Sequence, residues 1–209
     1  MKRMSLSDGK IEDSVLDEGR ETTIYSLEPT DDGLFVASYE YLSRYDEKTG
    51  LRRQIRLYGS GRRMVNSLLY DKSDNCVWVG VKGCLYKYDM ATEEVVRYIE
   101  FPGISLKTLA LDADGNLLLG TDAGLLVLDI EKKTFTQVAH DSRNTRSLCN
   151  NIIYDILSDS NRNVWLATER GVSLAQSNTV QHYIHLSELV STGEGNLFTF
   201  IHKDSFGDY

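Results

Sequence analysis

A short apolar register recurs along the chain and limits what it can fold into. Each copy has an apolar residue, two others, a second apolar residue, two others and then an acid, as in Val65, Leu68 and Asp71. The further copies are Leu106, Leu109 and Asp112; Ile153, Ile156 and Asp159; and Phe198, Ile201 and Asp204, with Ile24, Leu27 and Thr30 as a weaker first copy that lacks the acid. A chain built from copies of one unit is expected to stack these units side by side.

Each copy continues in the same order, with a second, a third and an outer strand. A large apolar residue in a β-forming run follows the polar turn, and the third strand starts six residues later. The large apolar residues are Phe35, Trp78, Leu118 and Trp165, and the third strands start at Tyr41, Cys84, Gly124 and Gly171. The steps between these starts are 43, 40 and 47 residues. Repeats of ~40–45 residues with several short strands are typical of β-propeller blades.

The register divides the chain into blades. We expect a leader or a remnant of a preceding blade at 1–21, four blades at 22–60, 61–103, 104–145 and 146–193, and the start of a truncated blade at 194–209. Their outer strands are expected at 54–58, 95–99, 135–138 and 180–184. The sequence therefore predicts an all-β fold, a β-propeller fragment of about four to five four-stranded blades. The remaining blades, or another copy of the chain, should cover the two open sheet faces.

Composition excludes several classes of function. The formal charge of −8 argues against a nucleic-acid partner. The sequence has no apolar run long enough to span a membrane, and its first ten residues contain no apolar signal segment. We therefore expect either a cytoplasmic chain, if it is natural as written, or an excised piece whose targeting segment lay upstream. Cys76, Cys84 and Cys149 are expected to be free thiols.

The stretch from Ser147 to Leu174, SLCNNIIYDILSDSNRNVWLATERGVSL, resembles the two-component regulator propeller repeat. Matches such as Leu85-Tyr-Lys-Tyr-Asp89 and Gly124-Leu-Leu-Val-Leu-Asp129 recur over nearly the whole chain. The copies depart from the usual pattern in several places. Tyr41 and Cys84 stand where Gly is usual, Gln176 replaces an Asp, and the third repeat lacks the Trp.

The resemblance implies a periplasmic sensor propeller, usually seven-bladed, of a hybrid two-component system. Such propellers commonly respond to oligosaccharides and signal to a histidine kinase across the membrane. A sensory role without catalysis would follow, with the kinase outside this chain. Two alternatives remain open: an interaction scaffold of the kind other propellers provide, and a sugar-acting lyase or hydrolase. The enzyme would need acid, base or metal-binding residues converging near the central channel, and the repeats contain no such cluster.

Other motifs favour structural interpretations. The segment from Asp112 to Asn116 resembles the opening of a calcium loop, but Ala123 stands where the loop needs its last carboxylate. A tight turn is therefore expected there. The histidines His140, His182, His185 and His202 are scattered, and neither a metal site nor a cofactor is expected. Trp78 and Trp165 are expected to pack between blades rather than stack on sugars.

Basic residues gather on the connections expected at one rim of the ring. In a four-stranded blade, the link between the second and third strands and the link to the next blade lie on the same rim. The candidate ligand-binding residues there are Tyr39, Arg62, Arg63, Lys82, Asp122, Arg143, Arg146 and Arg170, with Glu40, Asn144 and Glu169 beside them. Arginine binds carboxylate and sulfate groups in a bidentate manner, which suits an acidic sugar. The alternative is a solvated rim, or a surface on which another domain docks.

Overall fold

The computed structural model describes residues 2–5, 7–13, 23–38, 41–46, 49, 52–57, 64–175 and 183–185. Within these residues the regular elements are all strands, and the all-β prediction is confirmed. The strands are β1 (Lys2–Met4), β2 (Ile11–Asp13), β3 (Ile24–Thr30), β4 (Gly33–Ser38), β5 (Leu42–Asp46), β6 (Arg52–Ile55), β7 (Val65–Asp71), β8 (Cys76–Asp89), β9 (Val95–Leu111), β10 (Leu117–Thr121), β11 (Leu125–Asp129), β12 (Thr134–Val138), β13 (Ile153–Ser158), β14 (Val164–Thr168), β15 (Gly171–Ala175) and β16 (Tyr183–His185).

Two of the sheets are single four-stranded blades. Strands β3, β4, β5 and β6 form the first blade, and β13, β14, β15 and β16 form the fourth, each antiparallel and in chain order. Strands β1 and β2 form a separate two-stranded sheet. The assignment of 1–21 to a preceding blade stays a prediction.

The six-stranded sheet contains the second and third blades. Strand β8 doubles back near Gly83, whose φ is 77°, and the Met90 amide donates to the Asn75 carbonyl at 3.1 Å. It therefore supplies both the second and the third strand of one blade. Strand β9 pairs with β8 in its first part and with β10 in its second. One continuous strand is thus the outer strand of the second blade and the first strand of the third.

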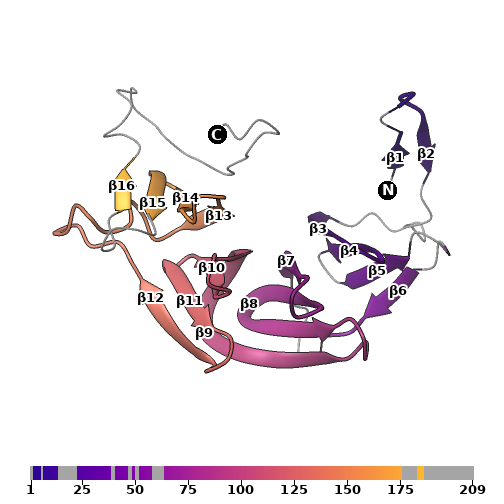
Figure 1. Cartoon of the computed structure of the whole chain (residues 1–209), viewed down its shortest axis with the longest axis horizontal. Coiled ribbons are helices and arrows are strands. Elements are labelled where there is room, and N and C mark those ends of the chain that lie inside the picture. Colours follow the sequence, from indigo (N-terminus) through magenta and orange to yellow (C-terminus); the bar gives the residue numbers. More distant parts are fainter. Residues whose placement is uncertain are drawn as a thin grey trace.

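The blades follow one another around an arc (Figure 1). The first strands β3, β7 and β13 lie towards the inner side of the arc, and β6, β12 and β16 lie on its outer side. This order, inner to outer within each blade and side by side between blades, is that of a propeller. The predicted propeller fragment is confirmed.

Three apolar clusters hold neighbouring blades together. Between the first and second blades, Phe35 packs with Val79 and Tyr86, and its ring lies 5.1 Å from that of Tyr88, edge to face. The second and third blades share a cluster that contains Trp78. The third and fourth share one that contains Leu118, Ile153 and Leu166. The second and third blades are apolar on both faces, and each face is buried against a neighbouring blade.

The two tryptophans occupy equivalent positions. Trp78 pairs with Leu69 and Trp165 pairs with Leu157, each two residues before the acid of its repeat. Trp78 is fully buried and meets the Tyr98 ring edge to face at 4.8 Å between centroids. Trp165 is half-buried. For Trp78 the structure bears out the expectation of packing between blades.

The acid of the register caps the turn that follows the first strand. Asp159 accepts hydrogen bonds from the amides of Asn161 and Asn163, both at 2.8 Å, and from Trp165 Nε1 at 3.1 Å. Asp112 accepts from the Asp114 and Asn116 amides in the same way. The carboxylate thus serves the turn, as the tight-turn interpretation of this segment expects.

A β-bulge in every first strand explains the spacing of three in the register. In the second blade, Val65 and Ser67 oppose consecutive residues of β8, so Asn66 has no opposite residue. An extra residue interrupts the alternation of faces, and Val65 and Leu68 therefore join the same cluster. The bulged residues of the four blades are Tyr25, Asn66, Lys107 and Tyr154.

A polar contact joins the first two blades at their outer side. Glu93 lies in the turn between β8 and β9 with a φ of 58°. Its carboxylate accepts from Arg44 at 2.9 Å and also from Arg53, residues on two strands of the first blade. One acid thus ties two neighbouring blades together.

Element boundaries differ from the predicted ones at the outer strands. The first outer strand is described as Arg52–Ile55, against the predicted 54–58, and the fourth as Tyr183–His185, against 180–184. Residues 58 and 180–182 of these predictions lie outside the described residues. Outer strands have only one partner strand, so their ends depend on weak local preferences. The truncated blade at 194–209, Gln176, His182 and His202 lie outside the described residues.

Replacing the turn acid should destabilise the fourth blade. In Asp159→Ala, the turn amides and the Trp165 indole lose their acceptor, and the free energy of unfolding should fall by about 2–4 kcal/mol. Urea denaturation measures the loss. Glu131→Ala, which removes an exposed acid from another turn, is the control and should change the midpoint little. Equal midpoints for the two variants would contradict the capping role.

Removing the charge of Glu93 should weaken the junction between the first two blades. Because this carboxylate is partly exposed, Glu93→Gln should cost about 0.5–1 kcal/mol of unfolding free energy at low salt, and less at high salt. Glu94→Gln removes the same charge from the next residue and is the matched control. Thermal unfolding at two salt concentrations gives both quantities. A salt-independent loss would show that packing, and not charge, is responsible.

Candidate functional site

Two of the predicted rim residues lie beside the same backbone segment. Lys82 is exposed and pairs with Ser105 across β8 and β9. Asp122 is exposed too; its Oδ1 accepts from the Ser105 amide at 2.9 Å, and its own amide donates to the Ser105 carbonyl at 3.3 Å. Lys82 and Asp122 therefore both adjoin Ser105, the first through strand pairing and the second through hydrogen bonds.

Arg143 and Arg146 lie on the loop 139–152 between the third and fourth blades. The Arg143 amide donates to Asp141 Oδ1 at 2.9 Å, and the Arg146 amide donates to Asn144 Oδ1 at 3.0 Å. The loop is therefore held by its own side chains while both arginines stay exposed. Such a loop can present guanidinium groups in a fixed arrangement.

The connection that carries Arg170 meets the end of this loop. The Glu169 amide donates to the Ile152 carbonyl at 3.0 Å, and the Arg170 amide donates to Thr168 Oγ1 at 3.3 Å. On the other side, the Gly124 amide donates to the Asn151 carbonyl at 2.8 Å. The loop thus bridges the connections that carry Asp122 and Arg170. Tyr39, Glu40, Arg62 and Arg63 lie outside the described residues.

The bulged residues of the first strands are not among the site residues predicted from the sequence. Asn66 Nδ2 donates to the Leu106 carbonyl at 2.7 Å, which joins the second blade to the third. The Lys107 ammonium lies 5.6 Å from the centre of the Tyr154 ring, which joins the third to the fourth. The spacing of three in the register could have revealed them, because a regular strand alternates with a period of two.

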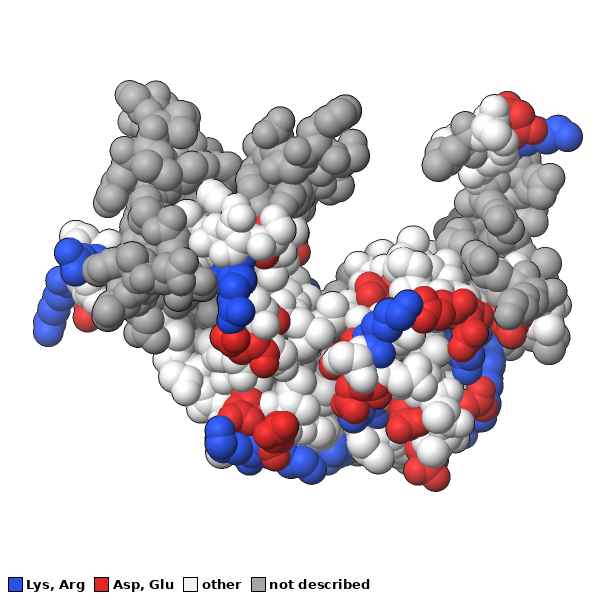
Figure 2. All heavy atoms as spheres, in the orientation of Figure 1, with Lys and Arg blue, Asp and Glu red and all other residues white. Residues whose placement is uncertain are grey.

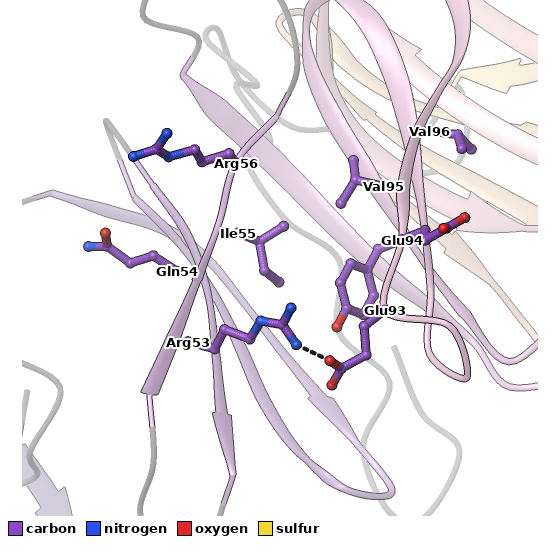
Figure 3. A pocket seen from close by; sticks show the side chains of 9 residues that line it. Arg53, Gln54, Ile55, Arg56, Glu93, Glu94, Val95 and Val96 are labelled. Carbon is purple, nitrogen blue, oxygen red and sulfur yellow. Dashed lines mark hydrogen bonds and ion pairs between the residues drawn. The ribbon is translucent and has the colours of Figure 1, made fainter.

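A groove of about 520 Å³ opens at the outer side of the first two blades (Figure 3). Figure 3 shows Arg53 and Arg56 on one wall and Glu93 and Glu94 on the other, with the ion pair of Arg53 and Glu93 between the walls. Tyr88 also lines it, and its buried hydroxyl has no hydrogen-bond partner among the described residues. The groove is crossed by the contact that joins the blades, which favours a structural role for it.

A cluster of possible metal ligands is engaged in other contacts. The ligand atoms of Asp71, Asp74 and Cys76 lie within 4.8 Å of one another. Burial raises the pKa of the Cys76 thiol to about 12, which keeps it protonated and a poor ligand. Asp74 pairs with Lys87, and Asp71 accepts from the Ser73 and Asp74 amides. These contacts account for the cluster as part of the turn of the second repeat.

The remaining chemistry is sparse. Cys76, Cys84 and Cys149 are buried free thiols, as expected. In the part of the chain that the structure describes, no helix has the length and apolar character needed to cross a membrane. Figure 2 shows acidic and basic side chains interspersed on the visible face rather than gathered into one basic patch.

Comparison with known proteins gives the chain relatives. Residues 147–170 match the model of the two component regulator propeller. The extracellular domain of the putative hybrid two component system BT4673 from B. thetaiotaomicron is 37% identical, with 99% of this chain and 28% of that chain covered and a TM-score of 0.78. No curated protein matches.

Two more distant structures share the fold alone. The extracellular domain of the putative hybrid two component system BT3049 from B. thetaiotaomicron is 18% identical, with 99% of this chain and 26% of that chain covered and a TM-score of 0.66. Virginiamycin B lyase from Staphylococcus aureus is 12% identical, with 88% of this chain and 62% of that chain covered and a TM-score of 0.68.

The chain therefore spans less than a third of the length of these two extracellular domains. The sequence match and the fold agree with the repeat recognised from the residues. The chain carries the two-component regulator propeller repeat and is a relative of the extracellular domain of a hybrid two-component system.

Proposed function

We propose that the chain is part of a non-catalytic sensor propeller that recognises an oligosaccharide and acts through a histidine kinase elsewhere in the same protein. The observation that carries this proposal is the 37% identity, over 99% of the chain, to the extracellular domain of a hybrid two component system. A periplasmic location follows from the same relationship. Virginiamycin B lyase is 12% identical and shares only the fold, so it does not favour an enzyme.

The exposed rim supports an acidic saccharide as the ligand. Arg143 and Arg146 share the loop 139–152, and the connection that carries Arg170 is hydrogen-bonded to the end of this loop at Ile152. A guanidinium group offers five N–H donors in a planar fork that matches a carboxylate or a sulfate. With Lys82, four cationic side chains lie on these connections, beside the acidic Asp122, Asp141 and Glu169. In a chain with a net charge of −8, this local balance is more positive than that of the chain as a whole, which favours an anionic ligand.

The first blade has an exposed apolar face, which favours a further blade as its partner. Ile24 and Leu27 are 41% and 48% exposed, whereas their equivalents Val65 and Leu68 are 1% and 5% exposed against the preceding blade. In the second blade the equivalent face is covered by the preceding blade, whereas in the first blade it is exposed. We propose that a preceding blade of the parent protein, or a second copy of the chain, covers it.

The rim proposal predicts the effect of removing the arginines. Arg143→Ala and Arg170→Ala should each weaken binding of an acidic oligosaccharide by about tenfold, or ~1.4 kcal/mol, because a charge-assisted pair is lost. Isothermal titration against acidic and neutral oligosaccharides measures this. Arg162→Ala is the control. Arg162 pairs with Asp114 and lies on the turn between the first and second strands of its blade, at the end of the blade opposite to the rim connections. Unchanged affinity in the rim variants, or an equal loss in the control, would refute the rim site.

The open face predicts self-association of the chain on its own. Sedimentation velocity should detect oligomers that Leu27→Asp reduces, because a charge on the apolar face opposes its burial. Val96→Asp is the matched control: Val96 is 49% exposed, as much as Leu27, but lies on an outer strand. If both substitutions had the same effect, general surface hydrophobicity and not the blade face would drive association.

A further inference from the structure

One backbone irregularity recurs at the same place in all four described blades. The bulged residues of the first strands are Tyr25, Asn66, Lys107 and Tyr154. A bulge redirects a side chain and is common next to binding sites. Three unlike residue types occupy this position, so no single local preference produces the bulge. The fold itself keeps the position, and the side chain there is left to vary.

All four side chains are polar, although apolar residues precede them. Ile24, Val65, Leu106 and Ile153 come immediately before the bulged residues, and the last three are at most 1% exposed. Tyr25 is 42% exposed, and Asn66, Lys107 and Tyr154 are half-buried. The polar side chains therefore keep access to solvent, and in the second, third and fourth blades they do so on strands that also supply core residues. Two of them, Asn66 and Lys107, also contact the next blade.

The bulged residues form a row across successive blades. Asn66 reaches the carbonyl of Leu106, the residue directly before Lys107. The Lys107 ammonium lies over the Tyr154 ring, 5.6 Å from its centre. Their strands are the inner strands of the arc (Figure 1). We call Tyr25, Asn66, Lys107 and Tyr154 the hub row.

The hub row adjoins the rim residues. Ser105, two residues before Lys107, is the residue that Asp122 and Lys82 flank. Arg170 and Tyr154 belong to the same blade, and the Tyr154 bulge lies opposite the end of β14, two residues before Arg170. A ligand that contacts the rim connections therefore extends naturally onto the hub row.

The chemistry of the row specifies a class of ligand. Two phenol rings offer apolar faces and hydroxyl groups, the Asn66 amide offers donors and an acceptor, and Lys107 supplies a positive charge. An oligosaccharide has apolar ring faces and many hydroxyl groups, and a uronic acid adds a carboxylate. We propose that the hub row is a subsite for an acidic sugar unit, with Lys107 binding its carboxylate or sulfate and Tyr154 holding its ring. This inference rests on the proposed recognition of an oligosaccharide.

Isothermal titration of the full chain tests the inference. The probes are oligomers of galacturonate and of sulfated galactose, with neutral galactose and glucose oligomers for comparison. Lys107→Gln should weaken binding of the acidic probe by about tenfold, and Lys107→Arg should retain it. Tyr154→Leu should also lose about tenfold, whereas Tyr154→Phe should lose less because the ring stays. Lys72→Gln, which removes a lysine paired with Asp31 near the turn after β7, is the control.

The outcomes separate this inference from the proposed function. Binding that depends on Arg143 and Arg170 but not on Lys107 or Tyr154 would overturn the hub row and leave the sensor proposal standing. A lower melting temperature with unchanged affinity in Lys107→Gln would show a contact between blades and also overturn it. If the folded chain binds none of the oligosaccharides, both proposals fall. Loss of affinity in Lys107→Gln and Tyr154→Leu, with the fold intact by circular dichroism, supports the subsite.

Discussion

Burial of apolar sheet faces between neighbouring blades is the constraint on which this structure depends. Phe35, Trp78 and Leu118 each lie in a cluster that two blades share. Burial of side chains of this size contributes about 1.5–3 kcal/mol each, and a blade standing alone would forfeit it. The turns, the bulges and the ion pairs between blades all serve to place these faces against one another. The same dependence leaves the first blade with an apolar face that no described residue covers.

The parts of the fold that the sequence could predict are those fixed by one repeat unit. The period, the order of strands and the acid of the turn follow from local spacing. The structure repeats the order of strands in each described blade and the turn acid in the second, third and fourth blades. The acid can be recognised in the sequence because its carboxylate accepts hydrogen bonds from two backbone amides of the turn, as in Asp112 and Asp159. An apolar residue could not accept these hydrogen bonds. Trp165 adds its indole to the same carboxylate, which links the turn to the second strand.

The ends of the outer strands and the position of the bulges could not be predicted from the sequence, because they depend on the partner strand. Strand β6 ends at Ile55, opposite Leu42, where β5 begins. The amino acids at 52–58 include no turn-forming residue that would predict this end. The bulge was present in the spacing of Val65 and Leu68, but spacing alone does not say which residue lacks a partner. The rim residues were placed by topology, and the contacts of Asp122 with Ser105 and of Gly124 with Asn151 join their connections. Their roles in binding depend on a ligand and stay proposals.

The continuous strand β9 has a mechanical consequence. Strands β7 to β12 belong to one six-stranded sheet, so the second and third blades are joined by backbone pairing as well as by side-chain packing. The third and fourth blades have no such shared strand and are joined by the loop 139–152. The first and second blades also lack a shared strand, and torsion is therefore expected to concentrate at these two junctions, of which the loop 139–152 carries Arg143 and Arg146. A junction without a shared strand is thus also the segment that carries two of the candidate binding arginines.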